Sequence, residues 1–152
     1  MKIGENVLTV LVGIPGSGKS TYVEKNKQPN EEVLSSDRIR KELLSGEEDQ
    51  TNNKLVFDTL YARARDFLSQ GKDVTIDATN ISIFERRRVL QNFADMQLKR
   101  VAIVFETPVE VCIERDEKRQ RTVGRDVIEK YARKYQKPRR NEGFDEIVFV
   151  KE

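Results

Sequence analysis

The sequence contains no histidine, only one cysteine and no apolar run long enough to cross a bilayer. Without histidine there are no imidazole metal sites, Ser-His-Asp triads or histidine general bases, so proton transfer must use a carboxylate, a lysine, a tyrosine or the lone thiol. Cys112 has no partner for an internal disulfide. The longest strongly apolar run, Val7–Val12, is far shorter than the roughly 20 residues that span a bilayer. We therefore expect a cytoplasmic protein with no membrane segment.

The length and charge of the chain favour a small soluble domain. Its 152 residues suit one compact core and leave no room for a second full domain, so we expect a single domain over residues 1–152. Charged residues make up 36% of the sequence, which favours solubility. The 28 basic and 26 acidic residues leave a net charge of +2, which argues against a generally basic protein that coats nucleic acid.

Segments with the apolar pattern of strands alternate with segments that have helical spacing. The predicted strands cover residues 7–12, 32–35, 74–77, 101–105 and 147–150. The predicted helices begin near Gly18, Ser36 or Asp37, Ser82 and Thr107, and two more are centred on residues 56–67 and 127–135. This alternation predicts right-handed βαβ units. The fold class is therefore a three-layer α/β domain with a central, mostly parallel five-stranded sheet and helices on both faces.

A glycine-rich loop is the strongest motif in the chain. The segment GIPGSGKS, residues 13–20, fits the P-loop pattern G-x-x-x-x-G-K-[ST] at every defined position, between a predicted strand and a predicted helix. In such a loop backbone N–H groups surround phosphates, Lys19 reaches the β and γ phosphates, and the Ser20 hydroxyl coordinates Mg²⁺. The alternative is an ordinary glycine-rich turn. The motif predicts that ATP is bound by Gly13, Gly16, Ser17, Gly18, Lys19, Ser20 and Thr21.

Two acidic residues follow predicted strands at the edge where a parallel sheet binds ligands. Asp37, in SSDRIRKEL, is the best candidate for a general base, and its alternative role is an N-cap. Arg40 lies three residues later and could hold a substrate phosphate, or be an ordinary surface arginine. Asp77 ends the strand VTID, where it could act on Mg²⁺ through water, orient a basic residue, or form an Asx turn. The sequence has no well-placed NKxD guanine-recognition motif and is short for an ATPase with a mechanical partner, so among P-loop proteins a small kinase is favoured.

Basic residues are concentrated toward the end of the chain. Arg115 and Arg119 are four residues apart and could clamp the transferring phosphoryl group from one face of a helix, or form a solvated helix end. Residues 115–140 hold eleven basic and four acidic side chains, which suits a polyanionic ligand. Residues 86–88 add a second basic stretch that a solvated face explains equally well. We expect Cys112 and Phe144 to belong to the core.

These motifs together resemble the kinase domain of polynucleotide 5′-kinases. The resemblance is carried by GIPGSGKST, the D-x-x-R of SSDRIRKEL, VTIDATN, the R-x-x-x-R of Arg115 and Arg119, and EGFDEI, and it covers nearly the whole chain. The most similar members are the kinase modules of bacterial and phage end-healing enzymes. The resemblance implies an adenylate-kinase-like P-loop fold and Mg²⁺-dependent transfer of the γ-phosphate of ATP to 5′-hydroxyl ends of DNA or RNA.

The resemblance also implies individual roles. Asp37 is the general base toward the 5′-hydroxyl, and Arg40 contacts the phosphate next to the acceptor nucleoside. Arg115 and Arg119 grip the donor phosphates from an arginine-rich lid at about residues 115–125, where Arg121 competes for the same role. Asp77 helps to arrange the site.

The resemblance names pathway partners as well, and other functions stay open. Many members of the family join the kinase to a phosphatase or ligase, so a separate ligase or phosphatase is an expected partner. The first alternative is a kinase that acts on a nucleoside, sugar or antibiotic hydroxyl. The second is a nucleotide-binding regulatory module without phosphotransfer.

Overall fold

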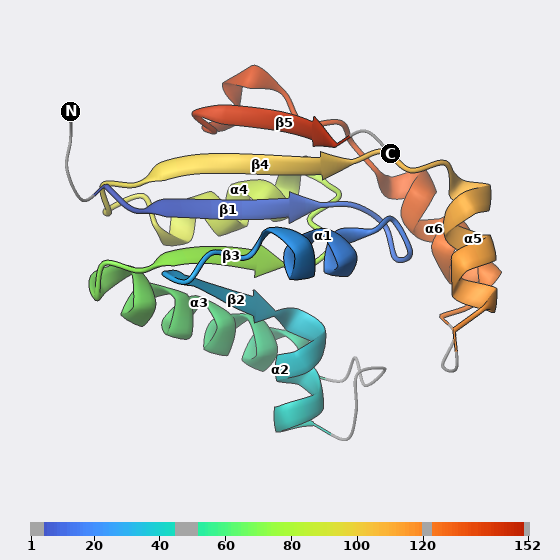
Figure 1. Ribbon diagram of the computed structural model, residues 1–152, viewed down its shortest axis with the longest axis horizontal. Coiled ribbons are helices and arrows are strands. Elements are labelled where there is room, and N and C mark those ends of the chain that lie inside the picture. Colours follow the sequence, from blue (N-terminus) through green and yellow to red (C-terminus); the bar gives the residue numbers. More distant parts are fainter. Residues whose placement is uncertain (1–4, 45–51, 120–122, 151–152) are drawn as a thin grey trace.

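One parallel sheet organises the chain. The computed structural model describes residues 5–44, 52–119 and 123–150. Its five strands have the order β2-β3-β1-β4-β5, and each neighbouring pair is parallel (Figure 1). The strands are β1 (Val7–Val12), β2 (Glu31–Ser35), β3 (Asp73–Asp77), β4 (Lys99–Phe105) and β5 (Glu146–Val150). The sheet is therefore parallel throughout, and the predicted α/β class is confirmed.

Helices occupy the connections between the strands. They are α1 (Lys19–Asn26), α2 (Ser36–Leu43), α3 (Asn53–Ser69), α4 (Ile83–Asn92), α5 (Val109–Glu117) and α6 (Arg125–Lys134), with a short 3₁₀ helix, η1 (Arg140–Glu142), before β5. None of the helices in the described ranges is long and apolar enough to cross a membrane.

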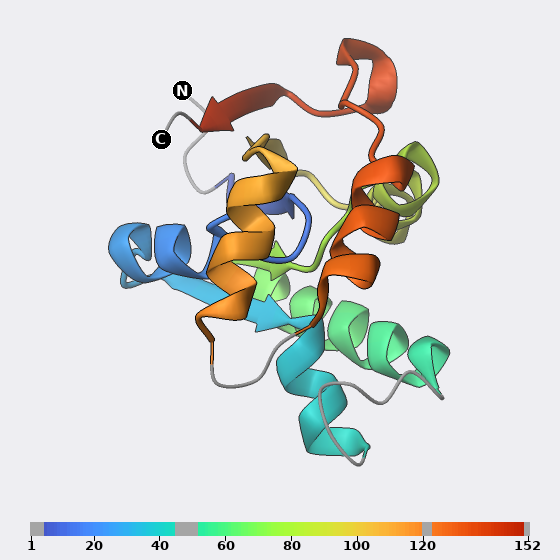
Figure 2. The same ribbon diagram turned by 90° about the vertical axis from the view of Figure 1, so that its right-hand side faces the viewer.

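The main core lies between the sheet and two helices. Alternate residues of β1, Leu8, Val10 and Val12, pack in one cluster with apolar side chains of α3 and α4, because side chains on a strand point to opposite faces in turn. Helix α1 lies on the other side of the sheet (Figure 2), where Tyr22 meets Phe105 of β4 edge to face at 5.4 Å. These contacts make the three layers.

The loops that carry the predicted motifs gather at one edge of the sheet. Since all the strands run in the same direction, the segments after β1, β2, β3 and β4 emerge at the same carboxyl edge. Helices α5 and α6 stand beyond that edge (Figure 1). A second, smaller apolar cluster, which includes Ile14, Ile81, Cys112 and Ile128, holds these two helices against the loops after β1 and β3.

Candidate active site

The P-loop leaves the N-terminus of α1 open to a ligand. Gly18 is the N-cap of α1 with a φ of 104°, and no side chain caps the helix there. The first backbone N–H groups of a helix have no partner within the helix, so they can bind an anion. The loop is fixed at its start, where the N–H of Gly13 donates to the carbonyl of Thr79 at 2.9 Å. The predicted strand–loop–helix setting is confirmed.

Close packing against α5 explains the glycine at position 16. Gly16 has a φ of 84°, and a Cβ there would lie 2.7 Å from the carbonyl oxygen of Cys112. The Thr107 hydroxyl donates to the carbonyl of Ser17 at 2.8 Å, and Nη1 of Arg115 donates to the carbonyl of Gly16 at 3.2 Å. The P-loop is therefore held against α5 and the segment before it by side-chain hydrogen bonds to its backbone carbonyls.

Lys19 forms an electrostatic cluster with two carboxylates. Its ammonium donates to the carbonyls of Gly13 at 2.7 Å and Ile14 at 3.1 Å. Burial lowers the pKa of Lys19, while the charges of Asp77 and Asp37 act to raise it. Burial raises the pKa of Asp77, and Lys19 opposes this effect. The start of α1, the start of α2 and the end of β3 thus place three predicted residues within reach of each other's charge.

Asp37 and Arg40 form an ion pair whose two members differ in exposure. The Arg40 side chain is 6% exposed, and its Nη1 donates at 2.8 Å to the Asp37 carboxylate, which is 69% exposed. Nη2 of Arg40 donates to Asn53 at 2.9 Å, whereas its Nε is buried and has no partner. The alternative of an ordinary surface arginine is therefore wrong, because Arg40 is buried and hydrogen-bonded to both Asp37 and Asn53.

The capping alternative for Asp37 is also wrong. Ser35 is the N-cap of α2, and its hydroxyl accepts from the N–H of Arg38 at 3.2 Å. We expected Ser36 or Asp37 to fill this position, but β2 runs directly into α2, so the cap falls on the last strand residue. The Asp37 carboxylate is thereby free of a capping role and stays exposed at the start of the helix.

The two lid arginines differ from the prediction. Helix α5 ends at Glu117, so Arg115 lies in its last turn while Arg119 lies in the bend beyond it. They therefore do not share a helix face, although both line the same cleft. Arg121 lies outside the described residues.

Asp116, which sequence reasoning passed over, is buried and accepts from the N–H groups of residues 123 and 124 at 2.8 Å each.

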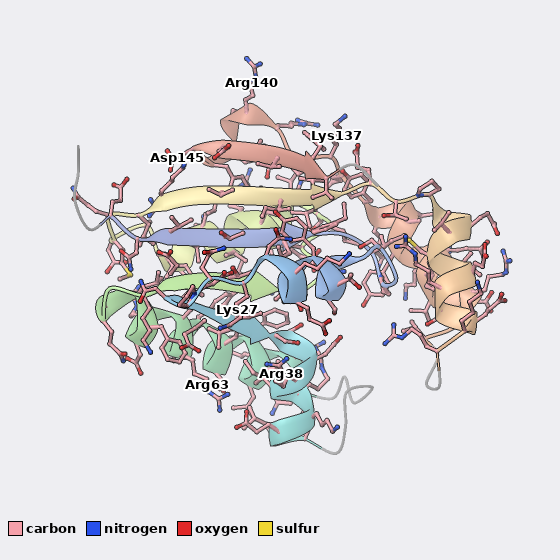
Figure 3. The ribbon with its side chains drawn as sticks, in the orientation of Figure 1. Lys27, Arg38, Arg63, Lys137, Arg140 and Asp145 are labelled. Carbon is pink, nitrogen blue, oxygen red and sulfur yellow. The ribbon has the colours of Figure 1, made fainter. Side chains whose placement is uncertain are left out.

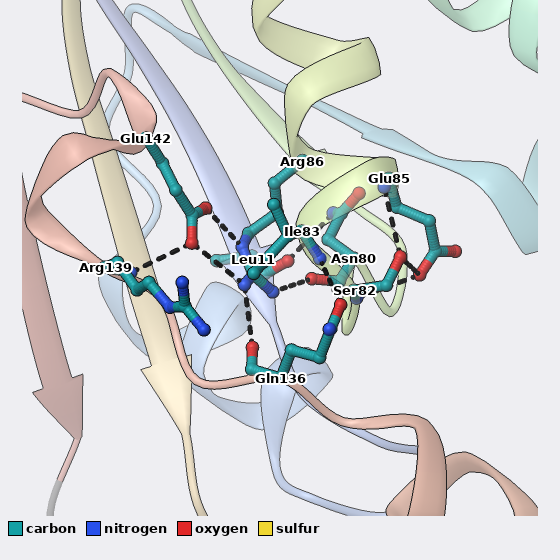
Figure 4. A network of polar contacts seen from close by, with 9 residues as sticks. All are labelled: Leu11, Asn80, Ser82, Ile83, Glu85, Arg86, Gln136, Arg139 and Glu142. Carbon is teal, nitrogen blue, oxygen red and sulfur yellow. Dashed lines mark hydrogen bonds and ion pairs between the residues drawn. The ribbon is translucent and has the colours of Figure 1, made fainter.

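A buried arginine anchors the segment that follows α6. Arg86 is fully buried and pairs with Glu142 at 2.7 Å (Figure 4). It also donates to the carbonyls of Asn80 at 2.8 Å and Gln136 at 2.7 Å. The Asn80 side chain in turn donates to the carbonyl of Leu11 at 2.9 Å. The network joins β1, the loop after β3, α4 and the segment after α6. The sequence gave no sign of this network, because Arg86 is one of three consecutive arginines and nothing in the pattern marks it as buried.

The predicted basic concentration divides into two regions. Lys130 and Lys134 of α6 line the cleft with the two lid arginines. Lys137 and Arg140, by contrast, lie on the β5 side of the molecule (Figure 3). Only part of the local positive charge therefore faces the site. The expectation that Cys112 and Phe144 are core residues is confirmed.

A large cleft brings the predicted residues together. Its volume is about 1960 Å³, which exceeds the roughly 300–1,000 Å³ of a site for one small ligand and leaves room for two. Among the candidate residues, those on its wall are Gly16, Ser17, Gly18, Lys19, Ser20, Thr21, Asp37, Arg40, Asp77, Arg115 and Arg119. Gly13, the first residue of the P-loop, is buried and is not part of the wall. The described residues contain no group of three acidic or cysteine side chains that would form a metal site of its own.

Comparison with known proteins places this chain in a family. The family model for the AAA domain AAA_33 matches residues 8–138. The chain belongs to the AAA_33 family. Together with the parallel sheet and the P-loop, the match confirms the predicted P-loop kinase fold.

Individual relatives share this domain in different settings. The transcription factor bHLH140 of Arabidopsis thaliana is 28% identical in an alignment that covers 95% of this chain and 16% of that protein. A chain of the Pnkp1/Rnl/Hen1 RNA repair complex has a TM-score of 0.75 and 24% identity, over 86% of this chain and 44% of that one. A sugar kinase from Janibacter sp. HTCC2649 has a TM-score of 0.71 and 13% identity, over 95% of this chain and 84% of that one. The chain spans less than half of the first two relatives, and the fold is common to proteins with different substrates.

Proposed function

We propose that the protein is an ATP-dependent polynucleotide 5′-hydroxyl kinase. The observation that carries the proposal is the Asp37–Arg40 pair, an exposed carboxylate beside a buried guanidinium, on the wall of a cleft large enough for two ligands. Arg40 also lines this cleft, and a guanidinium there suits a phosphate group of the acceptor. A nucleic-acid 5′ end offers such a phosphate next to its terminal nucleoside. A simple sugar has none, so this pair favours the polynucleotide over the small-molecule alternative.

The transfer step follows from this arrangement. The 5′-hydroxyl oxygen forms a bond to the γ-phosphorus of ATP, the bond from that phosphorus to the β–γ bridging oxygen breaks, and ADP leaves. The hydroxyl proton passes to the Asp37 carboxylate, which is exposed to the cleft. Arg40 holds both Asp37 and the acceptor phosphate, so it aligns the nucleophile with the base.

The donor is held by other residues of the same cleft. The open N–H groups of the P-loop and the Lys19 ammonium bind the ATP phosphates, with Lys19 leaving the carbonyls of Gly13 and Ile14. Arg115 and Arg119, in a lid at about residues 115–125, neutralise the transferring phosphoryl group. The Ser20 hydroxyl and the Asp77 carboxylate are oxygen donors of the kind that Mg²⁺ prefers, and Mg²⁺ there would neutralise phosphate charge.

A comparison of acceptors tests the proposed function. We expect kcat/KM with ATP to be highest for 5′-hydroxyl DNA or RNA oligonucleotides, lower for 3′-nucleoside monophosphates, and lowest for nucleosides and sugars. The KM of the oligonucleotides should rise steeply with salt because phosphate contacts release counterions, whereas the KM of an uncharged sugar should not. A sugar or free nucleoside that outperforms every oligonucleotide would replace this proposal with a small-molecule kinase. ATP binding without turnover on any acceptor would support a regulatory module.

The proposal extends to the organisation and pathway of the protein. We propose that residues 1–152 act as one kinase domain and that a separate ligase or phosphatase acts in the same pathway. The Pnkp1/Rnl/Hen1 assembly, described as an RNA repair complex, supports such a pathway for a related fold. Sealing of 5′-hydroxyl ends by a ligase, dependent on this protein and ATP, would test the partnership.

A further inference from the structure

An arginine lies between two aromatic rings beside the cleft. The guanidinium carbon of Arg88 is 4.9 Å from the ring centre of Phe57 and 6.0 Å from that of Phe84. Phe84 is 70% exposed, more than any other large apolar side chain in the described part of the chain. Phe57 is half-buried and belongs to the cleft wall. The three side chains thus form a stack that runs from the cleft to the outer surface, and we call it the Phe84–Arg88–Phe57 stack.

Arg88 forms no ion pair within the described ranges. No carboxylate lies within ion-pair distance of it there, and its Nε is buried without a hydrogen-bond partner. Arg86, two residues earlier on the same helix, is by contrast fully buried and paired with Glu142. A guanidinium that rests on aromatic faces and lacks a carboxylate is suited to a ligand that combines flat rings with negative charge.

The stack continues directly from the proposed acceptor site. Asn53, which accepts from Arg40, lies one helical turn before Phe57 on α3, so about 6 Å along the helix axis separates the two positions. Ser82 and Glu85, which flank Phe84 in the sequence at the start of α4, also line the cleft. The cleft wall therefore reaches the stack both from α3, through Phe57, and from the start of α4.

We infer that the Phe84–Arg88–Phe57 stack binds the bases of the acceptor strand on the 3′ side of its terminal nucleotide. The inference rests on the proposed function and adds to it a second contact, which only acceptors longer than one nucleotide reach. Aromatic and guanidinium faces bind any base by stacking, so the contact recognises single-stranded nucleic acid without reading its sequence. The positive charge of Arg88 attracts the phosphates that join those bases.

A comparison of acceptor lengths tests this inference. The acceptors are a 5′-hydroxyl hexanucleotide and a 3′-nucleoside monophosphate, and the variants are Phe84→Ala and Arg88→Gln. Stacking on an aromatic side chain is worth a factor of roughly 5 to 150 in affinity per base. We expect the hexanucleotide KM to rise about tenfold in Phe84→Ala, with kcat unchanged and the KM of the mononucleotide unchanged. Arg88→Gln should raise the same KM and weaken its salt dependence.

Phe149→Ala is the matched control. Phe149 is 40% exposed and also lies under a cation, Lys137 at 4.9 Å, but it is on the edge strand β5. Its removal should leave both KM values unchanged. A Phe84→Tyr variant keeps the ring and should keep the hexanucleotide KM, whereas loss of folding would lower the activity with both acceptors.

The outcomes separate this inference from the proposed function. If wild type, Phe84→Ala and Arg88→Gln phosphorylated the hexanucleotide with the same KM, the proposed role of the stack in base binding would be wrong, and the kinase assignment would stay intact. Equal KM increases for both acceptors would also overturn it, because the effect would then be on the shared terminal site. Failure of the wild type to phosphorylate any oligonucleotide would overturn the proposed function and the inference with it.

Discussion

Gly16 and Arg40 hold their positions in the site for different physical reasons. At Gly16 the backbone has a positive φ, and the carbonyl of Cys112 occupies the place of a side chain. Arg40 is a buried charge, so it must have partners, and Asp37 and Asn53 supply them. The glycine lets the P-loop and α5 touch, whereas the arginine fixes the carboxylate that we propose as the base.

Substitution of Gly16 should cost more than substitution of a glycine with the same backbone angle elsewhere. Gly16→Ala places a Cβ 2.7 Å from a backbone oxygen, while Gly71, also at φ 84°, has nothing within 4 Å of its Cβ position. We expect Gly71→Ala to lose about 1 kcal/mol of stability from the left-handed backbone alone. Gly16→Ala should lose clearly more and should also weaken ATP binding, as measured by urea unfolding and calorimetry. Equal losses in stability with unchanged ATP affinity would contradict the close approach.

The buried carboxylate of Asp77 should make stability depend on pH. Burial raises its pKa above the ordinary value of 3.8, so the folded state holds the proton more tightly than the unfolded state does. The stability gained from this tighter proton binding is complete below pH 3.8 and is lost as the pH rises through the raised pKa. Asp77→Asn should therefore be more stable than wild type at pH 7, and the gain should shrink as the pH falls toward 4.

A carboxylate with the opposite shift serves as the control for Asp77. The hydrogen bond from Arg63 lowers the pKa of the exposed Glu42, so Glu42→Gln should show no stability gain at pH 7. Thermal unfolding of the two variants and wild type between pH 4 and 7 checks both signs. If Asp77→Asn, like Glu42→Gln, showed no gain in stability at pH 7, the charge of Asp77 would not be unfavourable in the folded state.

At the scale of elements, local patterns predicted most of the helices and strands. The alternating and 3.6-residue spacings of apolar residues located the five strands and the helices between them, and the Ser82–Glu85 capping box is present. The end of α5 was placed too late, because its last turns carry charged residues on every face and give no apolar signal. The burial of Arg40 and Arg86 was also beyond the sequence, since it depends on partners 13 and 56 residues away.

The Arg86 network should be the main polar support of the segment after α6. Arg86→Met leaves the Glu142 carboxylate buried without its partner, so we expect a loss of about 3–5 kcal/mol in unfolding free energy. Addition of Glu142→Gln should recover part of that loss. The exposed Lys54–Asp58 pair on α3 is the control, and Lys54→Met should cost less than about 1 kcal/mol. Similar costs for both methionine variants in urea unfolding would contradict a structural role for Arg86.

At the scale of the whole molecule, the parallel sheet accounts for the position of the site. Strands β1, β2 and β3 bring the P-loop, the Asp37–Arg40 pair and Asp77 to one edge, and residues of α5 and α6 line the same cleft. The order of the strands was not predicted, because β1 pairs with β3 and β4 through contacts that skip along the sequence. The P-loop could be located because it is one continuous motif. The residues that we propose for the acceptor come from separate elements.

Transfer of label from γ-labelled ATP tests the central claim most directly. The acceptors are matched 5′-hydroxyl and 5′-phosphorylated oligonucleotides, and the proteins are wild type, Asp37→Asn and, as control, Asp58→Asn on the surface of α3. The account predicts label on the hydroxyl ends only, at a rate about 100-fold or more lower in Asp37→Asn, with ATP affinity unchanged. Label transferred equally well by Asp37→Asn would contradict the assignment of the base. No label on either oligonucleotide, with ATP still bound, would contradict the polynucleotide kinase itself.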